Sequence, residues 1–339
     1  MCRNYRQRDT EETLKGYLGV DVGSVSTNLV LLDEGNEVAA SVYLRTMGQP
    51  IRAVQEGLRQ LGAQLPPDVE VIGAGTTGSA RHLSGIIVGA DIVKNEITAH
   101  AVAALHVVPE VRTVLEIGGQ DSKIILLQEG IVIDFAMNTV CAAGTGSFLD
   151  HQAARLDIPI EDFGDYALRA ESGVQIAGRC SVFAESDMIH KQQVGHPIDS
   201  IIFGLCEALV RNFLNNLAKG KSIEAPVVFQ GGVAANVGMK RAFEEALKVE
   251  VVVPEHFAVM GAIGAALLAR ELDPPASNFK GFRVTEIEYH TSSFNCKGCS
   301  NNCEIVKIMV EGDVLARWGG RCGKWELDLP GVKAGASTR

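Results

Sequence analysis

The feature that most constrains the fold is a repeated pattern of short apolar strands and acidic, glycine-containing turns. The first copy begins at Tyr17, and a second copy follows at an offset of 95 residues. Asp21-Val22-Gly23 matches Glu116-Ile117-Gly118, and Glu34-Gly35 matches Glu129-Gly130. Apolar and β-branched runs broken by turn residues predict an antiparallel meander in each copy. We interpret the match as an internal duplication, with chance similarity between two hairpins as the alternative.

The rest of the chain alternates predicted helices and strands. Helical periodicity predicts helices at 53–61, 146–156, 182–192, 197–217, 237–247 and 260–272, and apolar runs predict strands at 226–230 and 249–253. Asp273-Pro274-Pro275 marks a boundary, beyond which the chain is rich in cysteine and in β-forming residues.

Length and charge narrow the class of protein. The chain has 339 residues, enough for about two domains and a small third. Its 41 Asp and Glu against 31 Lys and Arg give a net charge of −10, which argues against nucleic-acid binding. No secretion signal is visible, and the best apolar run, at 258–269, is shorter than the roughly 20 residues of a membrane span. We therefore expect a cytoplasmic protein, in which disulfides are rare and 8 cysteines need another explanation.

Three glycine-containing turns follow buried strands, at 21–27, 116–121 and 230–236. Glycine lets backbone N–H groups approach an anion without a clash at Cβ, and serine and threonine hydroxyls add donors. Asp21 and Asp121 are candidates to hold Mg²⁺ through water. A P-loop is absent from the sequence, and none of the three turns is a G-x-G-x-x-G strand-to-helix unit of the dinucleotide type. The three turns together therefore predict a phosphate site of another kind.

Two meanders with acidic turns and a late Gly-Gly turn resemble the actin, sugar-kinase and heat-shock-chaperone ATPase superfamily. The resemblance implies an α/β fold of two duplicated, ribonuclease H-like lobes that close on ATP. It also implies the residues at the nucleotide. These are Asp21, Gly23, Ser24, Val25, Ser26, Thr27, Gly118, Gly119, Gln120, Gly231, Gly232, Val233 and Asn236.

Cys141 and Cys180 each stand just before a predicted helix. The positive end of a helix dipole favours a thiolate and any anion bound there, and a [4Fe-4S] cluster with four thiolate ligands is such an anion. One chain supplies two ligands, so a twofold dimer would complete the set. The alternative is that both are ordinary buried cysteines, as we expect for Cys206. Cys2 is expected to be an exposed thiol in the tail.

The sequences around these cysteines carry a more specific resemblance. Asn-x-x-Cys141-Ala-Ala-Gly-Thr-Gly, Cys180-x-Val-Phe-Ala-Glu-Ser and the segment 94–100 resemble activators of 2-hydroxyacyl-CoA dehydratases and ATPase subunits of benzoyl-CoA reductase, the BadF/BadG/BcrA/BcrD family. The resemblance covers about residues 17–272. It implies a homodimer that holds one [4Fe-4S] cluster through Cys141 and Cys180 of each subunit.

The domain boundaries follow from the duplication and this resemblance. We expect a disordered tail at 1–16, a first lobe at 17–100 and 257–272, and a second lobe with the cluster cysteines at 101–256. A cysteine-rich module at 276–330 and a disordered tail at 331–339 complete the chain.

The module contains Cys296-x2-Cys299-x3-Cys303 and, further on, Cys322. In a cytoplasmic protein such spacing predicts a metal site, either Zn²⁺ or a second Fe–S cluster, because so small a core needs a metal to fold. Unliganded surface thiols remain the alternative. The module resembles a segment of longer activase-type homologues and is absent from short activators.

These features lead to the hypothesis of an ATP-dependent, low-potential electron donor that serves a partner Fe–S enzyme and is itself reduced by a ferredoxin or flavodoxin. Gln120 and Asp121 are expected to position the attacking water, and Glu96 and His100 to form hydrogen bonds between the lobes. A small-molecule kinase of the same superfamily and a non-enzymatic metal-binding or regulatory module are the alternatives.

Overall fold

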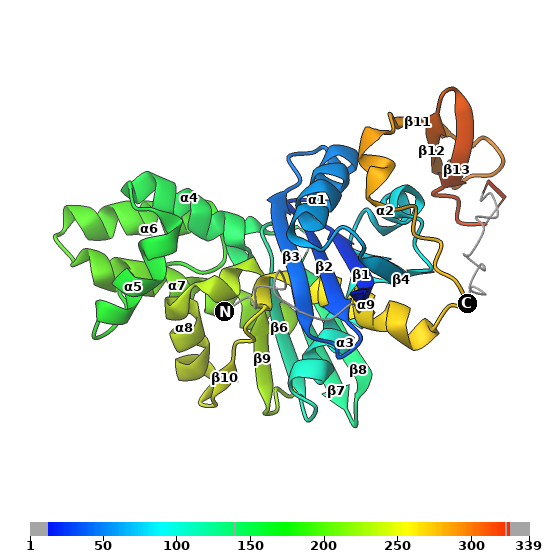
Figure 1. Cartoon of the computed structure of the whole chain (residues 1–339). Helices are drawn as coiled ribbons and strands as arrows, with labels where there is room; N and C mark the ends of the chain where they lie inside the picture. Colours follow the sequence, from blue (N-terminus) through cyan, green and yellow to red (C-terminus); the bar gives the residue numbers. More distant parts are fainter. Residues whose placement is uncertain (1–12, 139, 323, 326–339) are drawn as a thin grey trace. The chain divides into compact units, whose positions relative to one another are not determined.

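The computed structural model describes residues 13–138, 140–322 and 324–325. The chain forms two compact units (Figure 1). One unit contains the chain up to Ala99 and again from Gly261, and the other runs from His100 to Met260. The chain passes between them within helix α3 (Glu96–Val107) and at the start of helix α9 (Met260–Leu272). Within the part of the chain that the structure describes, no helix has the length and apolarity that a membrane crossing requires.

A five-stranded mixed sheet, in the order β3-β2-β1-β4-β5, forms the centre of the first unit. Its strands are β1 (Lys15–Val22), β2 (Ser26–Asp33), β3 (Val38–Arg45), β4 (Glu70–Thr77) and β5 (Ile92–Val93). The first three form the predicted antiparallel meander, and β4 and β5 add in parallel. The expected tail at 1–16 is too long, because Lys15 and Gly16 already pair with β4.

Helices cover both faces of this sheet because side chains alternate along each strand. Helices α1 (Pro50–Gln64) and α2 (Arg81–Val88) pack on the face that carries Leu18 and Val20. Helix α9 packs on the opposite face, at Gly19, where a Cβ would lie 1.8 Å from the carbonyl oxygen of Ala262. Glycine at this strand position therefore lets the helix backbone touch the sheet backbone.

The second unit repeats the architecture of the first. Its sheet has the order β10-β9-β6-β7-β8. The strands are β6 (Thr113–Ile117), β7 (Ser122–Gln128), β8 (Ile131–Asn138), β9 (Val227–Gln230) and β10 (Val251–Val252). Both meanders have an irregular step in the same place, at Leu31/Leu32 and, 95 residues later, at Leu126/Leu127. This agreement confirms the duplicated lobes that the sequence predicts.

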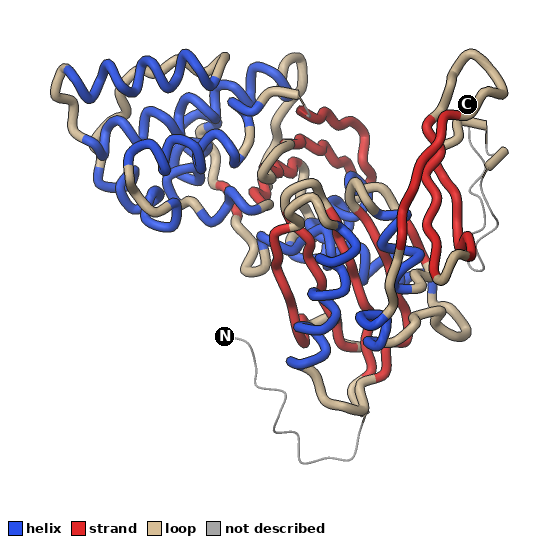
Figure 2. Tube along the Cα trace, turned by 90° about the horizontal axis from the view of Figure 1, so that it is seen from above, coloured by secondary structure: helices blue, strands red, loops and turns tan. Residues whose placement is uncertain are grey.

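A helical layer is inserted between β8 and β9 of the second unit, and Figure 2 shows its helices gathered at one end of that unit. It consists of η2 (Ala142–Gly144), α4 (Gly146–Leu156), α5 (Ile160–Arg169), α6 (Ser181–Gln193) and α7 (Ile198–Leu217), with η3 (Gly232–Ala235) and α8 (Val237–Leu247) after β9. Phe203 and Phe213 of α7 pack in one core with Ile117 and Phe229 of the sheet. The long α7 thus anchors the layer to the strands.

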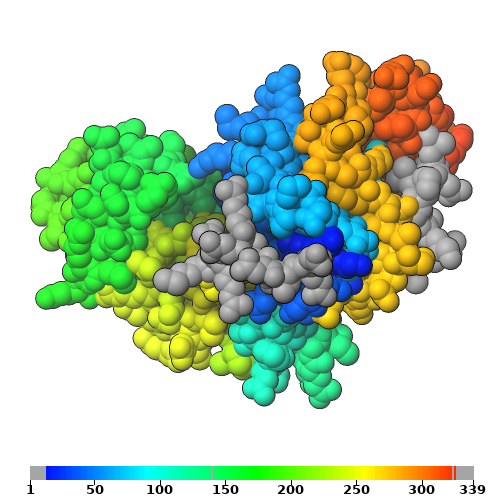
Figure 3. Space-filling model, viewed as in Figure 1, coloured from blue at the N-terminus to red at the C-terminus, as the bar shows by residue number. Residues whose placement is uncertain are grey.

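The cysteine-rich segment packs against the first unit. After η5 (Phe282–Glu286), strands β11 (His290–Asn295), β12 (Glu304–Val310) and β13 (Asp313–Trp318) form a three-stranded antiparallel sheet. Ile308 and Ala316 belong to the same buried cluster as Leu18, and Figure 3 shows the segment in orange and red beside the blue and cyan surface of that unit. The buried carboxylate of Asp91 ties down the connection by accepting hydrogen bonds from Ser277 Oγ and the Asn278 N–H, both at 2.8 Å.

Candidate functional site

The first expected phosphate turn joins β1 to β2. The Gly23 N–H donates to the Ser26 carbonyl at 2.9 Å and closes a tight turn with Ser24 exposed at its tip and Val25 half-buried. This leaves the tip of the turn open to an anion. The second turn, between β6 and β7, has the equivalent bond 95 residues later, from the Gly118 N–H to the Asp121 carbonyl at 3.0 Å.

Thr46, which follows β3, supports the first turn from behind. Its N–H donates to the Val25 carbonyl at 2.7 Å and its hydroxyl to the Gly23 carbonyl at 3.0 Å. Thr27 was expected to offer its hydroxyl to phosphate, and this expectation is wrong. The Thr27 side chain is fully buried, and its Oγ1 pairs with Thr46 Oγ1 at 2.9 Å, so Thr27 supports the turn instead.

Asp21 lies near the end of β1, between Asn28 of β2 and Thr77 of β4 in the register of the sheet. Asn28 Oδ1 and Thr77 Oγ1 are buried and have no hydrogen-bond partner among the described residues. Unpaired buried oxygens are costly unless water or a ligand satisfies them. A carboxylate between two such oxygens fits a hydrated Mg²⁺, which binds through few carboxylates and several waters.

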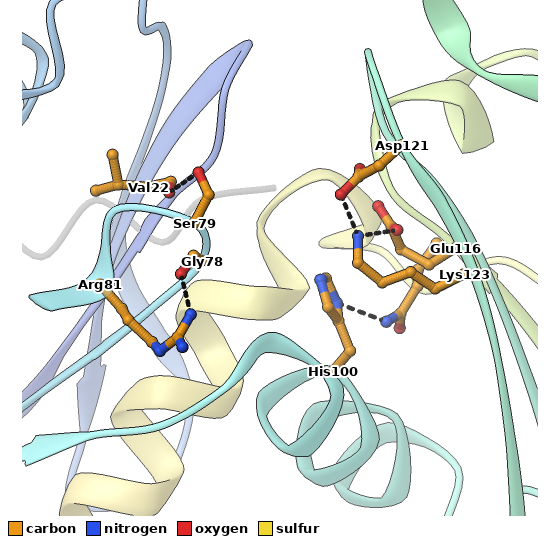
Figure 4. Close-up of polar contacts among 9 residues, drawn as sticks. Val22, Gly78, Ser79, Arg81, His100, Glu116, Asp121 and Lys123 are labelled. Atoms are coloured by element: carbon orange, nitrogen blue, oxygen red, sulfur yellow. Dashed lines mark hydrogen bonds and ion pairs between the residues drawn. The ribbon is translucent and has the colours of Figure 1, made fainter. Parts of the chain in front are cut away.

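A turn after β4, which the sequence did not single out as part of the site, packs against this first turn. Ser79 Oγ donates to the Val22 carbonyl at 3.2 Å, and the Arg81 guanidinium donates to the Gly78 carbonyl at 3.1 Å (Figure 4). A Cβ on Gly78 would lie 2.5 Å from Asp21 Oδ1. Glycine at this position therefore leaves room for the Asp21 carboxylate.

In the second turn a buried lysine holds two carboxylates. Lys123 Nζ lies 2.8 Å from Glu116 Oε2 and 3.0 Å from Asp121 Oδ2 (Figure 4). Gln120 is exposed beside them. Sequence reasoning missed Lys123, whose only trace in the sequence is a charge directly before the apolar run 124–127, which does not show its partners.

The third turn begins at Gly231, whose φ of 90° lies in the region that favours glycine. Gly232 and Val233 continue into η3, and Val233 is buried. The expectation that Asn236 contacts the nucleotide is only half supported, because its Oδ1 caps α8 by accepting from the Met239 N–H at 3.1 Å. Its Nδ2 is buried without a partner among the described residues, so this atom alone could donate to a ligand.

His100 contacts the residue at the start of the third turn, and the hydrogen bonds expected between the lobes at Glu96 and His100 stay a prediction. His100 Nδ1 lies 2.9 Å from Gln230 Nε2, and both residues belong to the second unit. Burial, with a smaller contribution from the charge of Lys123, lowers the pKa of His100 to about 3. The imidazole is therefore neutral and structural, while Glu96 lies in the first turn of α3.

The two predicted cluster cysteines lie on neighbouring loops. Cys141 caps η2 and Cys180 caps α6, each with an extended backbone and a half-buried side chain. Cys141 Sγ lies 3.9 Å from the carbonyl oxygen of Arg179. The side chain of Asn138 holds Cys141 by accepting from its N–H at 2.9 Å and donating to its carbonyl at 2.8 Å. Both thiols thus stand at helix starts, as the sequence predicts.

Asn212 of α7 connects these loops and was missed by sequence reasoning. Its buried amide donates to the carbonyl of Gly178, and a Cβ on Gly144 would lie 2.6 Å from its Oδ1. Apolar side chains surround the thiols on the surface, where Val140 is 94%, Val182 67% and Phe183 66% exposed. Exposed apolar groups of this size beside a polar site are typical of an interface.

The metal site predicted at the four C-terminal cysteines stays a prediction. Among the described residues, no three or more His, Cys, Asp or Glu side chains are grouped closely enough to hold a metal. Cys296 is buried, Cys303 is half-buried, and Cys299 and Cys322 are exposed. Cys296 Sγ accepts hydrogen bonds from Trp325 Nε1 at 3.1 Å and the Gly298 N–H at 3.4 Å. The indole bond is the main cause that lowers the pKa of this thiol.

The remaining cysteines are accounted for differently. Cys206 is fully buried in α7, and burial raises its pKa to about 12, which confirms the prediction that it belongs to the core. Cys2 lies outside the described residues.

Comparison with known proteins agrees with this arrangement. Residues 18–269 match the model of the BadF/BadG/BcrA/BcrD ATPase family. The activating ATPase of (R)-2-hydroxyglutaryl-CoA dehydratase from Acidaminococcus fermentans is 36% identical over 256 residues, which are 74% of this chain and 96% of that protein. One of the subunits of benzoyl-CoA reductase from Thauera aromatica is 31% identical over 176 residues, 50% of this chain and 62% of that polypeptide.

A solved structure gives the same fold. The activator of the 2-hydroxyisocaproyl-CoA dehydratase from Clostridium difficile, with bound ADPNP, superposes with a TM-score of 0.70 and 30% identity. The match covers 76% of this chain and 95% of that one. With its two duplicated actin-like lobes and a family match over most of its length, the chain belongs to the BadF/BadG/BcrA/BcrD ATPase family.

Proposed function

We propose that this protein is an ATP-dependent activator that drives low-potential electron transfer from an intersubunit [4Fe-4S] cluster to a partner Fe–S enzyme. The partner would be a 2-hydroxyacyl-CoA dehydratase, a benzoyl-CoA reductase or a related double-cluster reductase, as the names of the relatives suggest. A ferredoxin or flavodoxin would supply the electron.

One observation carries this proposal: the second phosphate turn is bonded directly to the segment that follows Cys141. The N–H groups of Gly146 and Ser147, at the start of α4, donate to the carbonyls of Gly118 and Gly119, each at 2.8 Å. A Cβ on Gly146 would lie 2.9 Å from a methyl of Val233 in the third turn. A nucleotide that shifts either turn would therefore displace α4, and with it the loop of Cys141.

The proposed nucleotide site would be formed by the three glycine turns described above. The Gly23, Gly118 and Gly231 turns would present backbone N–H groups to the phosphates. Asp21 and Asp121 would hold Mg²⁺ through water, and the unpaired Asn28 and Thr77 oxygens would accept hydrogen bonds from those waters. Gln120 and Asp121 would orient the attacking water.

The cluster end would use Cys141 and Cys180 with the same two residues of a second copy. Their thiolates fit such a ligand set, because both are accessible, both stand at helix starts and neighbouring loops carry them. When bound, the cluster supplies one-electron chemistry at low potential. Val140, Val182 and Phe183 would bury their exposed apolar surface against the second copy.

Anaerobic purification tests the proposal. We expect a brown dimer with about four iron atoms per dimer. Cys141→Ser and Cys180→Ser should each abolish the colour, while Cys206→Ser, the matched control in the core, should retain it. A colourless monomer, or one that phosphorylates a small molecule, would contradict the proposal.

We also propose that the C-terminal cysteines bind a metal, Zn²⁺ or a second Fe–S cluster, once their loops close around it. Two N–H···S hydrogen bonds already favour a thiolate at Cys296, and the Cys296 N–H bonds the Cys303 carbonyl at 2.8 Å. Metal analysis of Cys296→Ser/Cys299→Ser should show loss of zinc or iron beyond the intersubunit cluster. An unchanged metal content would refute this site.

A further inference from the structure

We propose that Lys123 is a positioning residue that fixes the Asp121 carboxylate for ATP hydrolysis and does not itself bind the nucleotide. This inference rests on the proposed function. It starts from the ion pairs that Lys123 makes at the second phosphate turn, 2.8 Å to Glu116 and 3.0 Å to Asp121.

The exposure of the three side chains shows which way each one is directed. Lys123 is 2% exposed and Glu116 6%, whereas Asp121 is 35% exposed. The ammonium therefore points into the protein, and only the aspartate reaches solvent. Two carboxylates and one ammonium leave a single net negative charge, and Asp121 presents it at the surface of the turn.

The geometry holds one carboxylate oxygen and the backbone of Asp121. Oδ2 accepts the bond from Lys123, and Oδ1 occupies space that a Cβ at position 118 would restrict, since that Cβ would lie 2.9 Å from it. The Asp121 carbonyl also accepts the Gly118 N–H. A carboxylate held through one oxygen and through its own backbone has few orientations left, which favours the alignment of an attacking water.

Glu116 connects the ion pairs of Lys123 to the third turn. In the sheet register Glu116 stands between Lys123 of β7 and Gln230 of β9. A Cβ on Gly231 would lie 2.7 Å from Glu116 Oε1. Lys123 thus keeps in place a buried carboxylate on which the third turn rests, so the two turns share one ionic support.

The duplication provides an internal comparison. The residue 95 positions before Lys123 is Asn28, which pairs with Asp21 as Lys123 pairs with Glu116. The first meander forms with the neutral Asn28, so the meander itself does not need a cation at this position. We infer that the second copy carries lysine for the chemistry at its turn.

Binding of a phosphate by Lys123 is the competing interpretation. It would require the buried ammonium to leave both carboxylates and to reach the surface of the turn. Breaking the pair with Glu116 would separate a buried carboxylate from its lysine, which is strongly unfavourable. The positioning role needs no such movement.

The test compares variants that keep the interior neutral. Lys123→Met alone takes the lysine away from the buried carboxylate of Glu116 and can fail to fold. Glu116→Gln/Lys123→Met removes both charges, and Glu116→Gln alone is its reference because Lys123 still holds Asp121 there. The measurements are kcat and KM for ATP hydrolysis by the reduced, anaerobic protein and the affinity for ADPNP by calorimetry. Asp121→Asn is then compared with Asp121→Asn/Glu116→Gln/Lys123→Met, because both of these variants also keep the interior neutral.

We expect kcat of Glu116→Gln/Lys123→Met to be about tenfold or more below that of Glu116→Gln. This loss is a part of the roughly 10²–10⁴-fold rate enhancement that a positioned proton acceptor typically contributes. The ADPNP affinity of the double variant should stay within about threefold, because no contact of the phosphates is removed. With Asp121→Asn present, the further changes at Glu116 and Lys123 should have no effect, because Lys123 and Asp121 act as a unit. Lys123→Arg, which can still reach Asp121, should restore part of the rate.

Equal kcat values for the double variant and its reference would overturn the proposal, and so would a tenfold loss of ADPNP affinity or an additive loss with Asp121→Asn. Failure of the proposed function looks different. In that case the wild-type protein itself would neither bind ADPNP nor hydrolyse ATP, and no reaction would remain for Lys123 to assist.

Discussion

Gly231→Ala tests whether the close packing of the third turn against β6 matters for nucleotide binding as well as for the free energy of unfolding. Gly231 has a φ of 90°, and a Cβ there would lie 2.5 Å from the Ile117 carbonyl oxygen and 2.7 Å from Glu116 Oε1. Gly220, in the exposed turn after α7, has a φ of 77° and open space around the position of a Cβ. Gly220→Ala therefore measures the cost of the backbone conformation alone.

The two costs can be estimated separately. An alanine at positive φ costs about 1–2 kcal/mol, and this is all that Gly220→Ala should show. Gly231→Ala adds a collision with a strand carbonyl and with a carboxylate that Lys123 holds in place, and overpacking of this kind costs about 1–3 kcal/mol. The total expected for Gly231→Ala is about 2–5 kcal/mol in the free energy of unfolding.

Urea unfolding and ADPNP calorimetry measure the two variants. Because relief of the collision moves the third turn away from Glu116, we expect Gly231→Ala to weaken ADPNP binding by about tenfold or more. Gly220→Ala should bind as the wild type does. Equal destabilisation of both variants, with unchanged affinity in both, would refute the close approach of Gly231 to β6 and its part in nucleotide binding.

Two further predictions concern buried groups. Burial lowers the pKa of His100 to about 3, below its value of about 6.5 in the unfolded chain. Below about pH 6.5 the imidazole takes up a proton in the unfolded chain but not in the folded protein. The folded state therefore loses stability relative to the unfolded chain as the pH falls below about 6.5. The unfolding free energy of the wild type should decrease between about pH 6 and pH 4 by up to about 1.4 kcal/mol per pH unit more than that of His100→Asn, and parallel curves would contradict this. Asp91→Ala removes the hydrogen bonds to Ser277 and Asn278, each worth about 1.5–3 kcal/mol. Trypsin should therefore cut after Lys280 faster in this variant than in the wild type, and it should cut Asp91→Asn more slowly than Asp91→Ala.

Much of the fold could be predicted because its signals are local. The predicted helices at 146–156, 237–247 and 260–272 have the boundaries of α4, α8 and α9. Three helices were missed for different reasons. Helix α3 is apolar around most of its circumference and so shows little helical periodicity, α2 is short, and α5 begins after Pro159 without a capping side chain.

Some residues of the candidate site could be predicted from the sequence and others could not. The glycine turns could be found because an acidic, glycine-containing turn recurs 95 residues later and a Gly-Gly pair follows a third buried strand. Lys123, Thr46 and Asn212 could not, because each acts on residues that only strand register or helix packing brings beside it. The inward direction of Thr27 was likewise set by a tertiary contact, with Thr46. The capping role of Asn236 is local, and the asparagine directly before the predicted helix at 237–247 was a signal for it.

The central claim is that the nucleotide and the cluster cysteines are mechanically coupled through the start of α4. The rate at which bathophenanthroline removes iron from the anaerobic, reduced dimer tests it most directly, measured with ADP and with ADPNP. The account predicts rates that differ by about fivefold or more, the range of an ordinary allosteric coupling. Equal rates at saturating ADP and ADPNP would contradict it.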